Sequence, residues 1–185
     1  GRVTPRKYWA SAPEAKTGPL SRTQFLIFEL GRECNFGKAH HKCPNMHPER
    51  YAGLNTEREL TDDVILECAI RAYTEFGFGG LIGWHYYNEP TLQAERLIND
   101  EFTGLMDRIE MATSEARFVL WSNHTNPEWI RRHRHRFAQI HGYNYHDDPL
   151  GEKLDNRLVR LEEHGNRPCM RAWTELILDS YGNHH

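Results

Sequence analysis

The stretch FGGLIGWHYYNEPTLQAERL, residues 78–97, combines an apolar run, a polar turn and the start of a helical pattern. Residues 79–87, GGLIGWHYY, are mostly apolar and aromatic, which is typical of a buried strand. Asn88-Glu89-Pro90 comes directly at the carboxyl end of this strand. A proline near the first helical position and an acid near a helix N-terminus also make an ordinary strand-to-helix turn. The residues before and after this stretch are needed to distinguish an ordinary turn from a functional site.

The same alternation of apolar strands and amphipathic helices continues on both sides of this stretch. Helices are expected from the Thr61 N-cap to Gly77, from Leu97 to Ile109, from Pro127 to about His135 and over residues 150–165. Further strands are expected at 24–30, 117–123, 137–144 and, at the end of the chain, 173–183. Strands alternating with such helices predict βα units on a parallel sheet and therefore an α/β fold.

Composition limits the class of protein. A chain of 185 residues with 38% hydrophobic residues and five Trp is expected to form one domain, with residues 1–22 as an extended lead-in. The formal net charge of −3, with acids and bases interspersed, argues against a nucleic-acid partner. No long apolar run and no signal-like N-terminal segment are present, so we expect no membrane segment and a cytoplasmic location.

The four cysteines are too few and too scattered for a disulfide scaffold. Cys68 falls in the apolar stripe of the helix that follows Thr61, where a core role is expected. Cys34 and Cys43 lie in ECNFGKAHHKCPN, residues 33–45. The pattern Cys34-x5-His40-x2-Cys43-x3-His47 supplies four ligands of the types that tetrahedral zinc accepts. An unligated loop is the other interpretation of these residues.

Polar residues gather where the expected strands end. Cys34 and Cys43 follow the first strand, Asn88-Glu89-Pro90 the second, Ser122-Asn123-His124 the third and His141 to His146 the fourth. Because the carboxyl ends of parallel strands meet at one edge, these residues are predicted to share a rim, where α/β proteins carry their sites. Two rim histidines with Asp147 or Asp148 would also suit a mononuclear metal hydrolase.

These landmarks, in this order and strand context, resemble the radical SAM superfamily. The Cys-containing loop is similar to that family's CxxxCxxC loop, FGGLIGWHYYNEPTLQAERL to its GGEP segment, and Ser122-Asn123-His124-Thr125 to its third turn. RPCMRAWTELILDSYGN, residues 167–183, is similar to the start of a SPASM extension. The resemblance implies a partial (β/α) barrel over residues 23–165, with about four parallel strands, and a SPASM-like segment over 166–185 that carries a further strand.

The resemblance also implies roles for individual residues. Cys34, His40 and Cys43 would hold a 4Fe-4S cluster, with His40 where the family has its middle cysteine, or His41 or His47 in its place. Asn88, Glu89 and Pro90 would receive the amine of S-adenosylmethionine, and Ser122 and Asn123 its ribose or carboxylate. His141 and Tyr143 would face a peptide or small-molecule substrate. The implied reaction is reductive cleavage of S-adenosylmethionine to a 5′-deoxyadenosyl radical that abstracts hydrogen from the substrate.

That reaction requires an external electron donor. Only two of the three expected cysteines are present, however, and only about four parallel units precede Cys169. The protein is therefore predicted to be an iron–sulfur enzyme. The alternative is a degenerate form of the fold, zinc-bound or metal-free, that serves as a binding subunit. A partner chain that completes the barrel is compatible with either interpretation.

Overall fold

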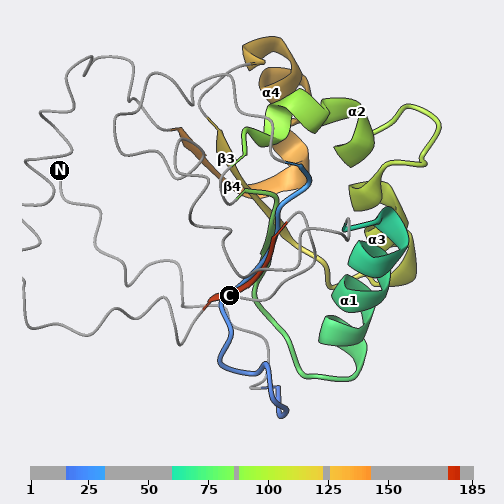
Figure 1. Cartoon of the computed structure of the whole chain (residues 1–185), viewed down its shortest axis with the longest axis vertical. Coiled ribbons are helices and arrows are strands. Elements are labelled where there is room, and N and C mark those ends of the chain that lie inside the picture. The colour runs from blue at the N-terminus through green and yellow to red at the C-terminus, as the bar shows by residue number, and fades with distance from the viewer. Residues whose placement is uncertain (1–15, 32–59, 86–87, 123–125, 143–174, 180–185) are drawn as a thin grey trace, which may run out of the picture.

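The described residues form a fully parallel sheet of five strands (Figure 1). The computed structural model describes residues 16–31, 60–85, 88–122, 126–142 and 175–179. The strands are β1 (Phe25–Phe28), β2 (Leu81–Gly83), β3 (Phe118–Ser122), β4 (Phe137–Gly142) and β5 (Glu175–Leu178), in the spatial order β4-β3-β2-β1-β5. The predicted α/β class is confirmed, and the last strand joins the sheet beside the first.

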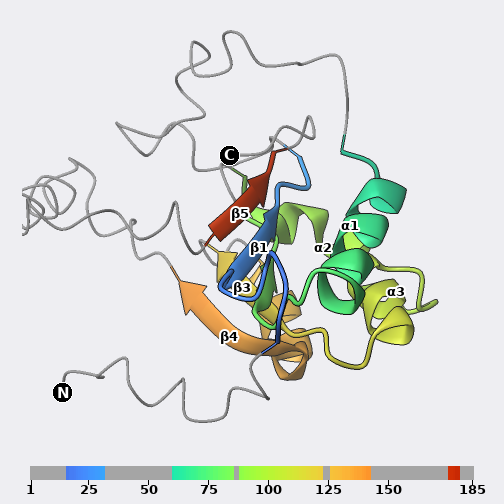
Figure 2. The same ribbon diagram turned by 90° about the horizontal axis from the view of Figure 1, so that it is seen from below.

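Helices fill the connections between these strands. They are α1 (Asp62–Thr74), the 3-10 turn η4 (Pro90–Gln93), α2 (Ala94–Leu97), α3 (Leu105–Ala112), α4 (Pro127–His133) and η5 (Arg134–Arg136). One buried cluster joins their apolar sides to alternate strand residues, among them Phe28, Trp84 and Leu120. Since side chains alternate between the faces of a strand, these helices cover one face of the sheet (Figure 2). The other face carries Ile27, Val119 and Trp121.

Helix α1 begins and ends where its sequence predicts. The Thr61 side chain accepts a hydrogen bond from the Val64 amide at 3.4 Å, and Asp62 and Asp63 occupy the first turn, where acids favour the helix dipole. After the last turn the chain passes through Gly77 at φ 72°, a left-handed conformation that favours glycine. The apolar stripe buries Ile65, among others, against the sheet.

The helix predicted from Leu97 to Ile109 is wrong in its first half. The structure has the one-turn α2, which ends at Leu97, then an irregular segment, and α3 only from Leu105. The side chain of Asn99 accepts from the Glu101 amide at 2.9 Å, which favours a turn over a helix. Phe102 adopts φ 59° and is 71% exposed. Its spacing from the neighbouring apolar residues fits a helix, but its side chain belongs to no buried helix face.

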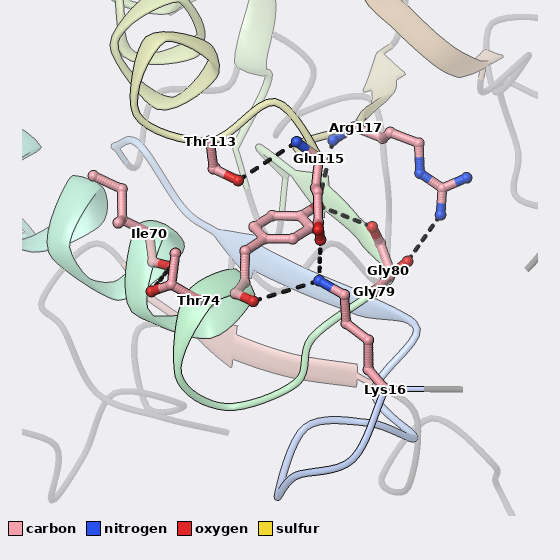
Figure 3. A network of polar contacts seen from close by, with 9 residues as sticks. Lys16, Ile70, Thr74, Gly79, Gly80, Thr113, Glu115 and Arg117 are labelled. Atoms are coloured by element: carbon pink, nitrogen blue, oxygen red, sulfur yellow. Dashed lines mark hydrogen bonds and ion pairs between the residues drawn. The ribbon is translucent and has the colours of Figure 1, made fainter. Parts of the chain in front are cut away.

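Hydrogen bonds around Tyr73 tie together the amino ends of the sheet strands (Figure 3). The Tyr73 hydroxyl donates to the Gly80 carbonyl at 3.0 Å and accepts from the Arg117 amide at 3.3 Å. The Lys16 ammonium forms an ion pair with Glu115 and lies over the Tyr73 ring. Burial raises the pKa of Tyr73 to about 12. This edge, opposite the predicted site, is therefore a structural junction between α1, β2 and β3.

Several predicted strands are longer than those observed. Of the range predicted as a strand over 79–87, the described residues form β2 at Leu81–Gly83, and in the described part of 173–183 β5 covers Glu175–Leu178. The predicted helix at 150–165 lies outside the described residues, as do most of the lead-in 1–22 and of the segment 166–185. Within the described ranges, no helix has the length and apolar character needed to span a bilayer.

Candidate functional site

The turn that follows β2 is built around a buried carboxylate. Glu89 is completely buried, and its Oε1 accepts three hydrogen bonds: from the Thr91 amide at 3.2 Å, the Thr91 hydroxyl at 2.5 Å and the Ser122 hydroxyl at 2.7 Å. Pro90 is the first residue of η4, where its missing amide hydrogen costs no helical bond. The glutamate therefore caps the short helix and also binds the end of β3.

Asn88 fixes the other side of the same turn. Its side-chain amide donates to the Trp84 carbonyl at 3.2 Å, and the residue is buried. The Trp84 ring itself packs between Phe28 and Phe118, with ring centroids 6.0 and 5.8 Å away. The turn is consequently tied to the backbone of a residue whose ring lies in the aromatic centre of the core.

Four of the predicted site residues thus lie together. Asn88, Glu89 and Pro90 form the turn, and Ser122 reaches it from the carboxyl end of the neighbouring strand. A hydrogen bond from a buried hydroxyl to a carboxylate is among the stronger side-chain contacts, at roughly 1.5–3 kcal/mol. This contact joins the ends of β2 and β3 at the edge where the sequence predicts a rim.

A second group of side chains crosses the same edge on the face that the described helices leave uncovered. We call it the edge row. The register pairs Trp121 with His141, and its extension past the ends of β1, β2 and β5 places His85, Glu29 and Asp179 in the same line. The Glu29 amide donates to the Leu178 carbonyl at 2.9 Å, which supports the extension at that end.

Ring contacts hold the aromatic half of the edge row. The imidazoles of His85 and His141 lie on either side of Trp121, with centroids 4.2 and 4.8 Å from the indole, and Phe25 meets the indole edge-on at 5.3 Å. Gly83 leaves space for His85, because a β-carbon there would stand only 3.2 Å from the imidazole Nδ1. The row offers an aromatic surface flanked by two titratable rings.

His141 is the one predicted catalytic residue in the described part of the chain. Its Nε2 lies 3.1 Å from the Gln139 side-chain oxygen, and partial desolvation lowers its pKa. Strand alternation puts His141 on the opposite face from Ser122. The structure therefore separates His141 from the Glu89 turn, although both lie at the same edge of the sheet.

The other predicted site residues lie outside the described residues. They are Cys34, His40, Cys43, Asn123 and Tyr143. The segment that carries the two cysteines leaves the described chain at Gly31, where a β-carbon would stand 3.7 Å from Nε2 of Gln93 in η4. Among the described residues, no group of three or more His, Cys, Asp or Glu side chains is placed to hold a metal ion.

Sequence reasoning missed Glu29, His85, Trp121 and Asp179. The sequence pattern that could have identified them is a polar or bulky residue at or near the end of an apolar run. Glu29 ends FLIFE and Asp179 ends LILD in this way. Strand alternation alone places such a residue on one face, but only the register between strands shows that the four belong to one line.

Comparison with known proteins gives no relative from which a role could be transferred. No family model matches the chain, no curated protein matches it, and no solved structure matches it.

Proposed function

We propose that the protein is a divergent radical SAM-type iron–sulfur enzyme that acts on a peptide or small metabolite. The observation that carries this proposal is the Glu89 turn, a buried, hydrogen-bonded turn at the carboxyl edge of a parallel sheet, beside the start of the Cys-containing segment. Polar turns at this edge are the usual place for sites in α/β proteins. The proposal extends the resemblance of the sequence to that family.

The arrangement of strands supports a partial barrel. β1 to β4 follow one another across the sheet in chain order, β5 returns to the other side of β1, and the described helices pack on one face. Doubly wound sheets also reverse direction, but they carry helices on both faces. One-sided, consecutive βα units are the arrangement from which (β/α) barrels are built, and in such barrels the face away from the helices is the interior. The edge row would then line the upper part of that interior.

The position of the Cys-containing segment is compatible with a cluster beside the turn. Because this segment begins at Gly31, next to Gln93 of η4, its ligands and the Asn88-Glu89-Pro90 turn start from the same edge. Cys34, His40 and Cys43 would hold the cluster in this proposal. A 4Fe-4S cluster would supply the electron that cleaves S-adenosylmethionine, after reduction by an external donor.

The protein's own side chains would position the reactants. Three donors already reach Oε1 of Glu89, so its first task is to hold the turn in shape, while the turn itself receives the amine of S-adenosylmethionine. Ser122 and Asn123 would contact the ribose or carboxylate, and His141 and Tyr143 the substrate. Trp121, between two imidazoles, would form an apolar wall that excludes water from the reacting groups.

Anaerobic purification followed by iron, sulfide and zinc analysis tests this proposal. We expect about four irons per chain in the parent protein, as a 4Fe-4S cluster requires, and their loss in His40→Ala. His135→Ala is the matched control, because His135 is an exposed residue of η5 far along the chain from the cysteines. The reduced protein should then cleave S-adenosylmethionine, and Glu89→Gln should weaken its binding, whereas Glu95→Gln, an exposed neighbour, should not.

Zinc without iron in the parent would contradict the proposal and favour a zinc-bound binding subunit. Absence of both metals would favour the metal-free alternative. Zinc that survives Cys43→Ser would instead favour the rim histidines as ligands.

A further inference from the structure

One arginine contacts both ends of the segment that carries the proposed cluster ligands. Arg96, in α2, donates from Nη1 to the Leu30 carbonyl and from Nη2 to the Leu60 carbonyl at 3.0 Å. Leu30 is the residue before Gly31, and Leu60 is the first described residue after the Cys-containing segment. Its Nε donates to Asp62 Oδ1 at 2.6 Å, in the first turn of α1.

The guanidinium group suits this arrangement. Its donors diverge in one plane, so a single side chain can bind three acceptors from different parts of the chain. The Arg96 side chain is only 25% exposed, and both leucines are buried in the core. Hydrogen bonds from a charged donor to partly buried carbonyls are stronger than those between neutral groups.

Arg96 also belongs to the same short piece of chain as the proposed S-adenosylmethionine turn. Residues 88–97 contain the turn, η4 and α2 without a break. Glu89 ties one end of this piece to Ser122 of β3, and Arg96 ties the other to the end of β1 and the start of α1. The contacts therefore fix both borders of the Cys-containing segment relative to the turn.

We propose that Arg96 is a positioning residue that holds together the two ends of the segment carrying Cys34, His40 and Cys43 and fixes them beside the Asn88-Glu89-Pro90 turn. The contacts of Arg96 are independent of the proposed function, and only its role toward the cluster rests on that function. Without the arginine, the borders of the segment would open separately, and its ligands would no longer start from a fixed place.

Amide hydrogen exchange of Arg96→Gln tests the proposal without any cofactor. The informative amides are those of Glu29, which donates to Leu178 at 2.9 Å, and Ile65, which donates to Thr61 at 3.0 Å, since each lies next to one border. We expect both to exchange about ten to a hundred times faster than in the parent, because local opening is governed by the contacts that oppose it. The amides of Phe78 and Ile82, at the far edge, should be unchanged.

Two further variants separate geometry from charge. Arg108→Gln removes an exposed partner of Asp63, the residue next to Asp62, and should leave all four amides unchanged. Arg96→Lys keeps the positive charge but not the planar donors, and exchange should stay fast at one border at least. Unchanged exchange in Arg96→Gln, or equal acceleration at all four amides, would overturn the proposal, because the first shows no clamp and the second only a general loss of stability.

Iron retention in the same proteins tests the role toward the cluster. In the presence of a chelator, iron should leave Arg96→Gln at least tenfold faster than it leaves Arg108→Gln. Equal rates would show that the clamp does not position the ligands. A parent protein without iron would count against the proposed function, and the clamp would still be judged by the exchange rates.

Discussion

Glu89 is a fully buried carboxylate that caps a short helix and also binds the neighbouring strand. A carboxylate without solvent exposure is costly unless donors surround it, and here the Thr91 amide, the Thr91 hydroxyl and the Ser122 hydroxyl all reach one of its oxygens. The sequence indicated a strand-to-helix turn with this acid near the helix N-terminus, but not the hydrogen bonds with Thr91. The contact with Ser122, which lies 33 residues later, depends on the pairing of β2 with β3, and no local pattern shows it.

Ionisation of Tyr73 makes the free energy of unfolding depend on pH in the alkaline range. The folded protein keeps the hydroxyl proton up to about pH 12, whereas a tyrosine in the unfolded chain loses it near pH 10. Unfolding therefore releases a proton between these values, and the free energy of unfolding falls as the pH rises through this range. Below about pH 10 both states are protonated and the contribution of Tyr73 is constant.

Tyr73→Phe isolates this contribution from that of the lysines that titrate in the same range. At neutral pH the variant should be less stable by about 1–3 kcal/mol, because the Arg117 amide loses its acceptor. At pH 11 the difference between parent and variant should shrink by about 1.4 kcal/mol, the value of one pKa unit. Urea unfolding of both proteins at pH 8 and pH 11 measures it, and an equal difference at both pH values would contradict the assignment.

At the scale of the element, α1 shows how far capping residues determine a helix. Thr61→Ala removes the side-chain acceptor for the Val64 amide and should lower the free energy of unfolding by about 1 kcal/mol. Thr61→Ser keeps the hydroxyl and should stay close to the parent. Thr74→Ala, in the last turn, removes only a hydroxyl that donates to the Ile70 carbonyl and should have a smaller effect. Urea unfolding at neutral pH compares the three, and equal losses for Ala and Ser at position 61 would exclude capping.

The elements that the sequence predicted well are those with local signals at both ends. Helix α1 has a cap, two acids in its first turn and a glycine after its last turn, and its bounds were predicted closely. The predicted helix from Leu97 to Ile109 rested on apolar spacing alone. Spacing does not detect the Asn99 turn or the left-handed Phe102, and there the chain leaves the helix.

The candidate site also has one part that the sequence predicts and one part that only the structure shows. The Asn88-Glu89-Pro90 turn could be located from sequence because it is contiguous. The edge row could not, because its members come from five strands and meet only through the register. His141 was predicted from its place at a strand end, but its separation from Ser122 follows from strand alternation, which a prediction without exact strand bounds cannot fix.

At the scale of the whole molecule, the sheet depends on its last strand. β5 pairs with β1 over four residues and supplies the carbonyl that the Glu29 amide binds. Removing residues 175–185 would expose that side of β1 as an open edge with unpaired backbone groups, a template for association with other chains. We expect this truncated protein to elute as larger species at rising concentration and to unfold at a lower temperature than the parent.

The matched control removes only residues 180–185 and leaves β5 in place. It should keep the elution volume and the unfolding temperature of the parent protein, as measured by size-exclusion chromatography with light scattering and by calorimetry. Equal behaviour of the two truncated chains would show that β5 contributes little to the sheet.

The pairing of β1 with β5 also determines when the sheet can be completed during synthesis of the chain. Phe25 and its partner Glu175 are separated by 150 positions along the chain, from 25 to 175. At roughly 5–20 residues per second, a ribosome needs about eight to thirty seconds to translate the interval. Until then the nascent β1 lacks the neighbour that β5 provides in the folded sheet. Chaperones that bind extended apolar segments have this interval in which to act.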